Sequence, residues 1–434
     1  MKEHIIIVGG GFGGLNLARK LGKKGYSITL IDKTNHHLFQ PLLYQVAAAA
    51  LSPGDVAEPI RSVLGKYRNV DVLLAEVTEV DKEKKEVHLK NGRILGFDKL
   101  ILAPGTVYNY FGNEAWKEYT YSLKSAADAI EVRERIFLSL EKAEQIDEPS
   151  LREPWLTYVI VGGGPTGVEM AGAIAEIAKR NMMRDFKKVS QNETRIYLVE
   201  AESRILSQYP EHLSEKAKDI LEDMGVRVLT GTPVTNIAKD RVDFGASSIH
   251  TPNIIWAAGV RGVPLADSLG AKQDFAGRVK TEPDLSLPGH PDIFVIGDAA
   301  YVEDEDGKPL PALAPVAIQQ ADFLAKYLTG KIEKGSRFSY LDKGSMATIG
   351  RAKAVADIRG FTFSGFFAWM MWSVVHIFFL IGFRNRFRVF MEWIWHYFTF
   401  KRGVRIITGR NYLKNDTLVN TQSSKKKELD DLLA

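Results

Sequence analysis

The chain of 434 residues contains no cysteine. This absence excludes a disulfide, a thiolate metal site and a cysteine nucleophile, so any redox chemistry must use another group. A strong excess of charge is also missing, since the formal net charge is only +4, and this argues against a dedicated nucleic-acid-binding protein. Apolar residues make up 45% of the chain and charged residues 25%, a balance that predicts a large folded core rather than a disordered chain.

The beginning of the sequence lacks the basic stretch, long apolar stretch and small cleavage residues that mark a signal peptide. It enters the apolar, β-branched run 4–8 almost at once, and such a run is typical of a buried parallel strand. We therefore expect the catalytic body to stay in the cytosol. The length suits two or three domains.

A glycine-rich turn follows this first strand. Residues 9–14 read GGGFGG, which is a G-x-G-x-x-G pattern, and a helical apolar pattern and a second strand ending at Asp32 come next. In such a unit Gly9 permits the tight turn, Gly11 lets the backbone approach a pyrophosphate, and Gly14 lets helix and strand pack closely. The helix N-terminus attracts the phosphates, and Asp32 can accept hydrogen bonds from ribose hydroxyls. The pattern predicts a dinucleotide site.

The same pattern recurs at residues 162–167, which read GGGPTG between a strand and a helix. The next strand ends at Glu200, 33 residues after Gly167, and the extra length indicates an insertion around 181–192. Two such units in one chain predict one permanent flavin and one exchanging nicotinamide cofactor. Glu200 favours NADH over NADPH because a carboxylate repels a 2′-phosphate. Arg204 lies nearby, and its positive charge would weaken this preference.

Three further apolar strands end in small-residue turns. Residues 98–105 and 253–259 are counterparts in the two halves, and we expect them to mark where the chain crosses between nucleotide-binding domains. The strand 293–296 runs into Asp298. This carboxylate is placed either to bind a polyol such as the flavin ribityl chain or to cap a following helix.

A long apolar run occurs near the C-terminus. Residues 363–383 contain only Ser364, Ser373 and His376 as polar side chains, and an aromatic segment, 387–400, follows. Three interpretations compete: a buried core helix, one transmembrane helix, or a monotopic anchor lying in one leaflet. The last is favoured, because aromatic and basic residues gather after the run as they do at a bilayer surface. These basic residues are Arg384, Arg386, Arg388, Lys401, Arg402, Arg405 and Arg410.

Taken in order, these segments resemble the flavoproteins with two dinucleotide-binding domains. Among them the chain is most similar to the type II NADH dehydrogenase family, the single-subunit NADH:quinone oxidoreductases that pump no protons. The resemblance spans residues 4–412 and is carried by HHLFQPLLYQVA (36–47), GGGPTGVEMAG (162–172), APVAIQQ (314–320) and the aromatic segment with FRNR (383–386). The third stretch departs from the family pattern A-Q-x-A-x-Q, because Pro315 replaces the first glutamine while Gln319 keeps the second. Pro315 also predicts a helix start.

The resemblance implies an α/β fold with two Rossmann-like dinucleotide-binding domains, one for FAD and one for NADH, plus a C-terminal helical membrane-anchoring segment. We expect a discontinuous FAD domain of residues 1–115 and 265–340, an NADH domain of 116–264, an anchoring region of 341–412 and a disordered tail of 413–434. The tail is polar and contains a lysine run, which is typical of disorder.

The implied activity is hydride transfer from NADH to FAD, followed by transfer of two electrons to a membrane quinone without proton pumping. Glu169 is expected near the nicotinamide and the quinone head, where it relays protons or orders the head groups; alternatively it is a polar helix residue facing solvent. Gln319 and Pro315 are expected beside the quinone. His376 is either a quinone contact or proton route, or a histidine bonded to a nearby carbonyl.

We expect the cofactors to be bound by the two glycine turns, the two acids and the closing segments, with no metal. The FAD residues are Gly9, Gly11, Phe12, Gly13, Gly14, Asp32, Lys33, Gln40, Ala103, Gly105, Asp298 and Ala317. The NADH residues are Gly162, Gly164, Pro165, Thr166, Gly167, Glu200, Ala258 and Gly259.

The missing cysteines exclude the related disulfide reductases, sulfide:quinone reductases and cysteine-dependent peroxidases. We expect peripheral attachment to an anionic surface on the cytoplasmic face of the cell inner membrane, a homodimer, and no nucleic-acid partner. The choice between ubiquinone and menaquinone stays open. Two rivals remain: a soluble NADH:acceptor reductase feeding a small iron protein, which needs no anchor, and a flavin-bearing NADH sensor or scaffold.

Overall fold

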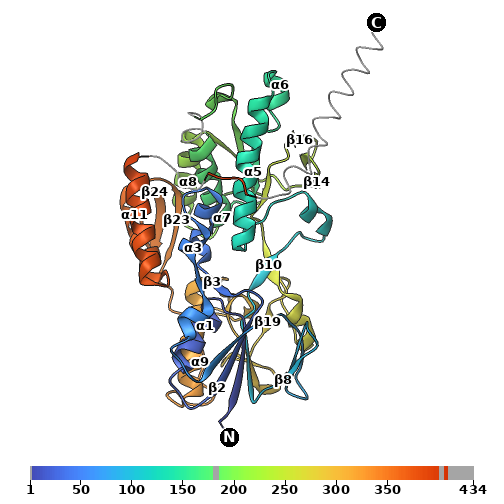
Figure 1. Cartoon of the computed structure of the whole chain (residues 1–434), viewed down its shortest axis with the longest axis vertical. Coiled ribbons are helices and arrows are strands. Elements are labelled where there is room, and N and C mark those ends of the chain that lie inside the picture. The colour runs from blue at the N-terminus through green and yellow to red at the C-terminus, as the bar shows by residue number, and fades with distance from the viewer. Residues whose placement is uncertain (1, 179–184, 400–404, 409–434) are drawn as a thin grey trace.

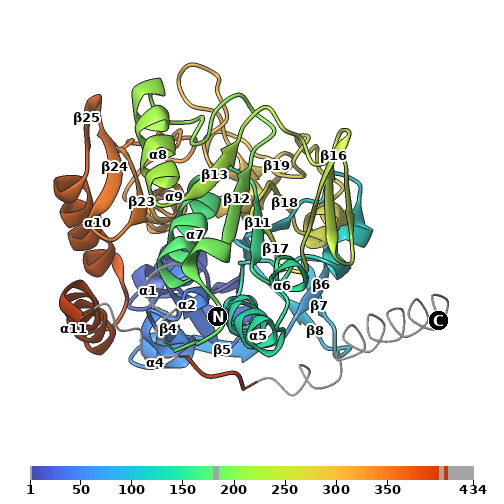
Figure 2. The same ribbon diagram turned by 90° about the horizontal axis from the view of Figure 1, so that it is seen from above.

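The computed structural model describes residues 2–178, 185–399 and 405–408. Two α/β bodies follow one another along the long axis, and the C-terminal elements form a layer on one flank (Figure 1). The view from above shows this layer beside the helices of the second body (Figure 2). The fold class expected from the sequence is therefore confirmed.

The first body contains a six-stranded sheet in the order β20-β21-β9-β1-β2-β5. All neighbours pair in parallel except β20 and β21. Each parallel strand is an apolar run, so both faces of the sheet are buried, and helices α1 (Phe12–Leu21) and α9 (Ala314–Leu328) pack against each other beside it. The strands are β1 (His4–Val8), β2 (Ser27–Asp32), β5 (Val70–Leu74), β9 (Lys99–Leu102), β20 (Ser286–Leu287) and β21 (His290–Val295).

Smaller elements complete this body. The antiparallel sheet β6-β7-β8 lies over one face, and the pair β3-β4 holds the segment after Asp32. Their bounds are β3 (His36–Leu38), β4 (Ala57–Pro59), β6 (Val77–Asp81), β7 (Glu86–Leu89), β8 (Ile94–Gly96), β19 (Val279–Lys280), β22 (Ala300–Tyr301), α2 (Leu43–Ala47), α3 (Pro53–Val56) and α4 (Ile60–Leu64).

The second body repeats the plan with the parallel sheet β13-β12-β11-β17. Helix α7 begins at Pro165, where a proline is tolerated because the first helical N–H groups have no partner within the helix. The bounds are β11 (Thr157–Val161), β12 (Arg195–Val199), β13 (Val226–Leu229), β17 (Ile254–Trp256), α5 (Ala126–Gln145), α6 (Pro149–Arg152), α7 (Pro165–Glu176) and α8 (Glu211–Asp223), with a hairpin sheet of β14 (Asn236–Ala238), β15 (Arg241–Phe244) and β16 (Ser247–His250). Part of the expected insertion at 181–192 lies outside the described residues.

The chain crosses between the two bodies on one antiparallel pair, β10 (Thr106–Tyr108) and β18 (Val260–Gly262). These strands directly follow the turns after β9 and β17, where the sequence predicts the crossings. Single 3-10 turns flank the connection on both sides, at Glu114–Glu118 and Pro264–Leu269.

The C-terminal layer consists of an antiparallel sheet and two helices. The sheet is β23 (Ser345–Gly350), β24 (Lys353–Ile358) and β25 (Phe361–Ser364), and α10 (Phe366–Phe379) and α11 (Phe383–Thr399) follow. The apolar run 363–383 is thus divided among a strand end, α10 and a break before α11. Within the described parts of the chain, no helix is long and apolar enough to cross a membrane. The predicted tail 413–434 lies outside the described residues.

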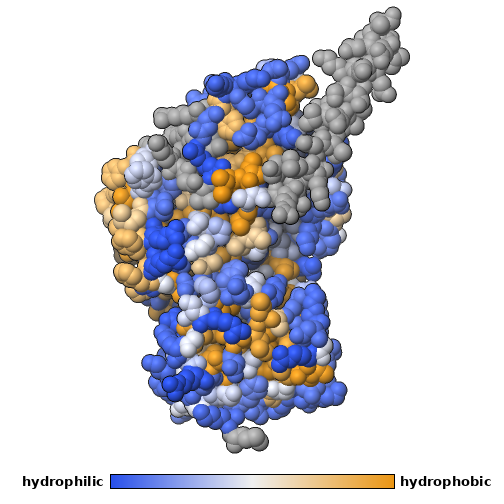
Figure 3. All heavy atoms as spheres, in the orientation of Figure 1, coloured by the Kyte–Doolittle hydropathy of each residue, from blue (hydrophilic) through white to orange (hydrophobic). Residues whose placement is uncertain are grey.

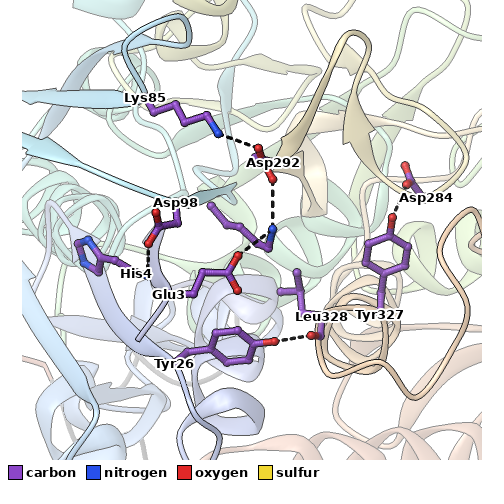
Figure 4. Close-up of polar contacts among 10 residues, drawn as sticks. Glu3, His4, Tyr26, Lys85, Asp98, Asp284, Asp292, Tyr327 and Leu328 are labelled. Atoms are coloured by element: carbon purple, nitrogen blue, oxygen red, sulfur yellow. Dashed lines mark hydrogen bonds and ion pairs between the residues drawn. The ribbon is translucent and has the colours of Figure 1, made fainter. Parts of the chain in front are cut away.

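A network of charges ties together the end of the first sheet where β1 begins (Figure 4). Asp98 accepts a hydrogen bond from the N–H of His4, with 2.6 Å between Oδ2 and N. Lys85 pairs with Asp292 at 2.8 Å, and Lys99 joins Asp292 to Glu3. This network therefore fixes the strand starts, and the opposite end, where the glycine turns follow, is left for function.

Candidate active site

The first glycine turn lies at the carboxyl ends of β1, β9 and β21. Gly9 has φ +103°, and a Cβ atom there would lie 2.1 Å from the carbonyl oxygen of Ala103. A Cβ on Gly14 would meet the Gly9 oxygen at 1.9 Å, whereas a Cβ on Gly11 meets nothing within 4 Å. Only glycine therefore fits at Gly9 and Gly14, and open space lies beside Gly11 at the N-terminus of α1, where a phosphate can approach.

Both carboxylate oxygens of Asp32 bond to the turn and to the next loop. Oδ2 accepts from the Gly10 N–H at 2.6 Å, and Oδ1 accepts from the N–H and hydroxyl of Thr34 at 2.6 and 2.7 Å. The acid is therefore fixed beside the phosphate turn, as a ribose-binding carboxylate requires. Lys33 next to it is exposed.

The second turn repeats this geometry in the second body. Gly162 has φ +109°, and its Cβ would lie 2.7 Å from the backbone nitrogen of Ala258. A Cβ on Gly164 would again meet nothing within 4 Å. Glu200 accepts from the N–H groups of Gly163 and Glu202 at 2.5 and 2.8 Å. Gly259 has φ +63° in the crossing turn, and Thr166 lies partly exposed in the first turn of α7.

Arg204 does not face the ribose acid as a free cation. Its guanidinium donates to the carbonyl oxygens of Ser207 and Tyr209 and to the hydroxyl of Ser214, at 2.6, 2.7 and 2.9 Å. These bonds hold the loop before α8. In the sequence, this arginine weakened the predicted preference for NADH over NADPH. In the structure it has a structural role.

Asp298 lies inside a 3-10 turn, Gly297–Ala299, whose N-cap is Ile296. The helix-capping interpretation of this acid is therefore wrong. Burial raises the pKa of the Asp298 carboxyl, while Lys124, Arg278 and a hydrogen bond from Thr106 lower it. The carboxyl is thus a buried polar group at the end of β21, beside the glycine turn.

Lys124 is a member of this group that the sequence did not single out. Its ammonium donates to the Thr106 hydroxyl at 3.0 Å, and burial lowers its pKa while Asp298 opposes that shift. The exposed Gln40 donates to the Lys124 carbonyl oxygen at 3.3 Å. An isolated lysine before a helix gives no local signal, because it is the crossing between the two bodies that brings it to Asp298.

Helix α9 joins the first turn through its N-terminal half. A Cβ on Gly13 would lie 3.5 Å from the carbonyl oxygen of Ala317, and buried Gln320 accepts from the Gly297 N–H at 2.6 Å. Pro315 lies in the first turn of α9 and is exposed. The amide of Gln319 both donates to and accepts from the Leu341 backbone at 3.0 Å, so it connects α9 to the segment that leads into β23. Gln320 thus contacts the turn at Gly297, whereas the sequence analysis singled out its neighbour Gln319.

A cavity of about 340 Å³ lies between α7 and the C-terminal layer. Glu169 lines it, and burial raises the pKa of this carboxyl well above its ordinary value, against a hydrogen bond from the Thr348 N–H. Glu169 does not face bulk solvent as a surface residue would. The other lining residues are Tyr44, Gln45, Ala50, Ala173, Glu176, Met224, Thr348, Ile349, Gly350, Arg351, Lys353, Trp369, Trp372, Trp393, His396 and Tyr397.

His376 stacks on Trp372 beside this cavity, with 4.1 Å between the ring centroids. Its Nδ1 lies 2.7 Å from the Trp372 carbonyl oxygen, and burial lowers its pKa to about 4. The ring is therefore neutral near pH 7, and Nδ1–H donates to that carbonyl. This is the carbonyl-bonded state that the sequence left open, and its edge also meets the ring of Phe39.

The outer faces of α10 and α11 carry exposed apolar side chains. In α10 only Ala368 and Trp372 are buried, so the core-helix interpretation is wrong. Apolar atoms gather on this flank of the molecule (Figure 3). The exposed residues are Phe366, Phe367, Met370, Met371, Val374, Phe378, Phe379, Phe383, Phe387, Phe390, Met391, Ile394, Trp395 and Phe398, and we call them the apolar face.

The inner side of α11 is bonded to residues between 45 and 55, at and after the end of the stretch 36–47. The indole N–H of Trp393 donates to the Gln45 amide oxygen at 2.7 Å, and His396 bonds the Ala50 carbonyl oxygen at 2.9 Å. Arg388 pairs with the buried Asp55 at 3.3 Å. The apolar face is therefore fixed to the first body rather than carried on a loose arm.

Comparison with known proteins agrees with this arrangement. The family model described as pyridine nucleotide-disulphide oxidoreductase matches residues 3–321, and the model described as NDH2 C-terminal domain matches residues 343–402. A type II NADH:quinone oxidoreductase of Mycobacterium tuberculosis is 39% identical over 94% of this chain and 91% of that protein. One from Staphylococcus aureus is 31% identical over 86% of this chain and 94% of that protein.

A solved structure of NDH2 from Plasmodium falciparum in complex with NADH has the same fold. Its TM-score is 0.87 at 23% identity, covering 94% of this chain and all of that one. The name of the broad family refers to disulphides, yet this chain has no cysteine and therefore cannot use thiol chemistry. The chain belongs to the pyridine nucleotide-disulphide oxidoreductase family and, within it, to the type II NADH:quinone oxidoreductases.

Proposed function

We propose that this protein oxidises NADH and reduces a quinone at a membrane surface, with FAD as its resident cofactor and without pumping protons. The observation that carries the proposal is the pair of matching glycine turns, each with a fixed acid, joined to an apolar face. The two glycine turns, each with its acid, provide two dinucleotide sites. The apolar face gives a lipid-soluble acceptor a place to enter. A soluble reductase or a sensor would not need that face.

The second turn fits NADH. Gly164 leaves open space at the N-terminus of α7, and Glu200 is held where a ribose 2′-hydroxyl would donate to it. Arg204 is bonded to Ser207, Tyr209 and Ser214, so its guanidinium is not free to bind a 2′-phosphate. These contacts support a preference for NADH, with the backbone of α7 orienting the pyrophosphate.

The first turn fits FAD. Asp32 would hold its adenosine ribose, Gly11 would admit the pyrophosphate, and the polar pair Lys124 and Asp298 would meet its ribityl chain or ring edge. When bound, FAD supplies the chemistry of accepting a hydride and passing on two electrons. The protein holds the reactants, excludes water and places a proton-bearing group nearby.

Glu169 is the group that we propose holds this proton. Burial stabilises its neutral carboxyl, and it lies in the helix that begins at the NADH turn. A neutral carboxyl can donate a proton to a quinone oxygen as that oxygen gains electrons. We also propose that Pro315 and Gln319 on α9 and His376 on α10 shape the quinone head site.

The finer setting is also part of this proposal. We propose attachment at the cytoplasmic face of the inner membrane, with the apolar face in the acyl boundary and Arg384, Arg386 and Arg388 near anionic headgroups. We further propose a homodimer formed through the C-terminal region.

The test is NADH oxidation by the protein purified in mild detergent, with and without a soluble quinone, beside NADPH. Rapid oxidation that requires quinone and prefers NADH is expected. Reduction of the flavin by NADH without quinone turnover would redirect the search to a protein acceptor or a sensing role.

A further inference from the structure

Gly172 lies in the interior of α7, where glycine is unfavourable compared with alanine. The packing of the helix explains its presence. A Cβ atom at this position would lie 1.6 Å from the carbonyl oxygen of Ile349 in β23 and 2.8 Å from its carbonyl carbon. Non-bonded heavy atoms prefer separations of about 3.5 Å, so an alanine would force the two backbones apart by more than about 1 Å.

Two hydrogen bonds hold α7 against β23 and the turn after it, one on each side of Gly172. The Glu169 carboxyl accepts from the Thr348 N–H, and Oε1 of Glu176 accepts from the Arg351 N–H at 2.6 Å. β23 is the edge strand of its sheet, and these bonds use N–H groups that an edge strand leaves free. The helix is therefore pressed onto the strand, and the contact at Gly172 sets the distance between them.

Helix α10 is fixed to the same sheet. Its Ala368 packs against Ala354 and Ala356 of β24, and none of these three small side chains is exposed. In Figure 2 the sheet stands between α10 and α7. The distance between α7 and β23 therefore also determines how far Trp369 and Trp372 of α10 lie from α7.

The cavity described above lies across this contact. Glu169 and Ala173 line it from α7, and Thr348, Trp369 and Trp372 line it from the C-terminal layer. Its volume of about 340 Å³ is at the small end of the roughly 300–1,000 Å³ typical of ligand pockets. A narrow space with two indole rings on its wall suits a flat ring and leaves little room for groups that project from the ring plane.

We propose that Gly172 determines which quinones this protein accepts, because its contact with Ile349 holds the cavity at a width that admits a flat quinone ring and excludes rings with bulky out-of-plane substituents. The inference rests on the proposed function, since it takes the cavity beside Glu169 as the place of the quinone head. Gly172 touches no reactant and acts as a positioning residue through the spacing of two elements. The NADH turn lies at the other end of α7 and keeps its geometry when β23 shifts.

The first test compares Gly172→Ala with Gly54→Ala, a glycine of the short helix α3 where a Cβ atom would meet nothing within 4 Å. Each variant is assayed with a methyl-substituted quinone, a quinone carrying tert-butyl groups, and ferricyanide. For Gly172→Ala we expect the ratio of kcat/KM for the tert-butyl quinone to that for the methyl quinone to rise roughly fivefold or more. The KM for NADH and the ferricyanide turnover should stay at wild-type values. Gly54→Ala should match the wild type in every assay.

A second variant, Ala368→Val, enlarges the cavity from the side of α10 without touching α7. It should shift the quinone ratio in the same direction, and it keeps the proposal testable if Gly172→Ala does not fold. A wild-type ratio in the folded variants would overturn the proposal. Equal loss with all three acceptors would also overturn it, because the contact would then serve folding alone. Failure of the wild type to reduce either quinone would instead refute the proposed function.

Discussion

Glu200 holds the second glycine turn with one carboxylate oxygen and the loop at Glu202 with the other, so replacing it by glutamine has a defined consequence. The amide nitrogen of Gln cannot accept from Gly163 or Glu202, and one of these charge-assisted bonds is lost. Such a bond contributes about 1.5 kcal/mol or more, so kcat/KM for NADH should fall roughly tenfold. The preference for NADH over NADPH should shrink as well, because the repulsion of a 2′-phosphate disappears.

The measurement is kcat/KM for both cofactors in Glu200→Gln and in Glu202→Gln. Glu202 is exposed and contributes its backbone N–H, which the substitution leaves in place. An unchanged NADH-to-NADPH ratio in the Glu200 variant would contradict the assigned role of this carboxylate.

His376 makes the stability depend on pH in a predictable direction. Its pKa is lowered from 6.5 to about 4 in the folded protein, so between these values the unfolded chain binds a proton that the folded chain does not. Its contribution is complete above pH 6.5 and is lost as the pH falls toward 4, by at most about 3 kcal/mol. We expect His376→Gln to lose less thermal stability than the wild type between pH 7.5 and 5.

The comparison uses melting temperatures in mild detergent at the two pH values, with His250→Gln, an exposed histidine of β16, as the control. Because other buried groups titrate in the same range, the informative quantity is the difference between variant and wild type. Identical slopes for His376→Gln and wild type would mean that this ring does not resist protonation.

Residues whose role depends on nearby sequence were predictable. Gly9 and Asp32 belong to one strand–turn–helix–strand unit, and the spacing alone places them together. Lys124 and Gln320 were not predictable, because a tertiary crossing and one turn of α9 decide what they touch. Sequence spacing informs contacts within a supersecondary unit and says little about contacts between units.

At the scale of elements, α11 shows how a membrane-facing helix is held by its other side. Trp393 and Trp395 belong to the same helix, yet Trp393 donates to Gln45 whereas Trp395 is 57% exposed on the apolar face. Trp393→Phe removes the donor and leaves the Gln45 amide oxygen unpaired, which should cost about 1–2 kcal/mol of stability.

Trp395→Phe is the matched control and should leave the stability nearly unchanged, since its ring meets solvent in the protein without lipid. The two variants are compared by thermal unfolding and by hydrogen exchange of the α11 amides. Faster exchange is expected only for Trp393→Phe, and equal exchange in both variants would show that this bond does not hold the helix.

The element at residues 363–383 was predicted as an apolar segment, but its division was not. Gly365 has φ +80° and Gly382 has φ +90°, and these two positions end the strand and separate α10 from α11. Hydropathy counts apolar side chains and does not register where a glycine reverses the chain. The transmembrane and the monotopic interpretations were therefore both compatible with the same sequence.

At the scale of the whole molecule, the two-body architecture was predictable because the same sequence pattern occurs twice in the chain. Each glycine turn comes with its own strand, helix and acid, and this repetition identifies two dinucleotide-binding domains. The cavity was not predictable, because its walls come from α2, α7, β23, α10 and α11, which meet only in the folded chain. It lies between α7, which begins at the second glycine turn, and the two helices that carry the apolar face.

Because the apolar face lies on the outer side of α11, we expect that membrane binding can be impaired without loss of quinone reduction. Phe387 and Phe398 are 57% and 75% exposed on α11, and Phe387→Glu with Phe398→Glu would place two charges in the acyl boundary. Because burial of one phenylalanine is worth about 1.5–3 kcal/mol, vesicle affinity should fall at least tenfold. Turnover with a long-chain quinone embedded in vesicles should fall with it, whereas turnover with a soluble short-chain quinone should stay near the wild-type rate.

Phe275→Glu is the control, since Phe275 is 97% exposed in the first body and lies outside the apolar face. Cosedimentation with vesicles of anionic and of zwitterionic lipid measures the binding. The zwitterionic vesicles show whether repulsion between the new carboxylates and an anionic surface explains the loss.

If the double variant kept its turnover with embedded quinone, the apolar face could not be the entrance for the acceptor. Loss of both activities would mean that α11 also supports the proposed FAD site, because Trp393 and His396 on its inner side bond to Gln45 and Ala50, in the segment after the proposed FAD residue Gln40. Loss of the embedded-quinone activity alone would therefore separate the role of the outer side of α11 from that of its inner side.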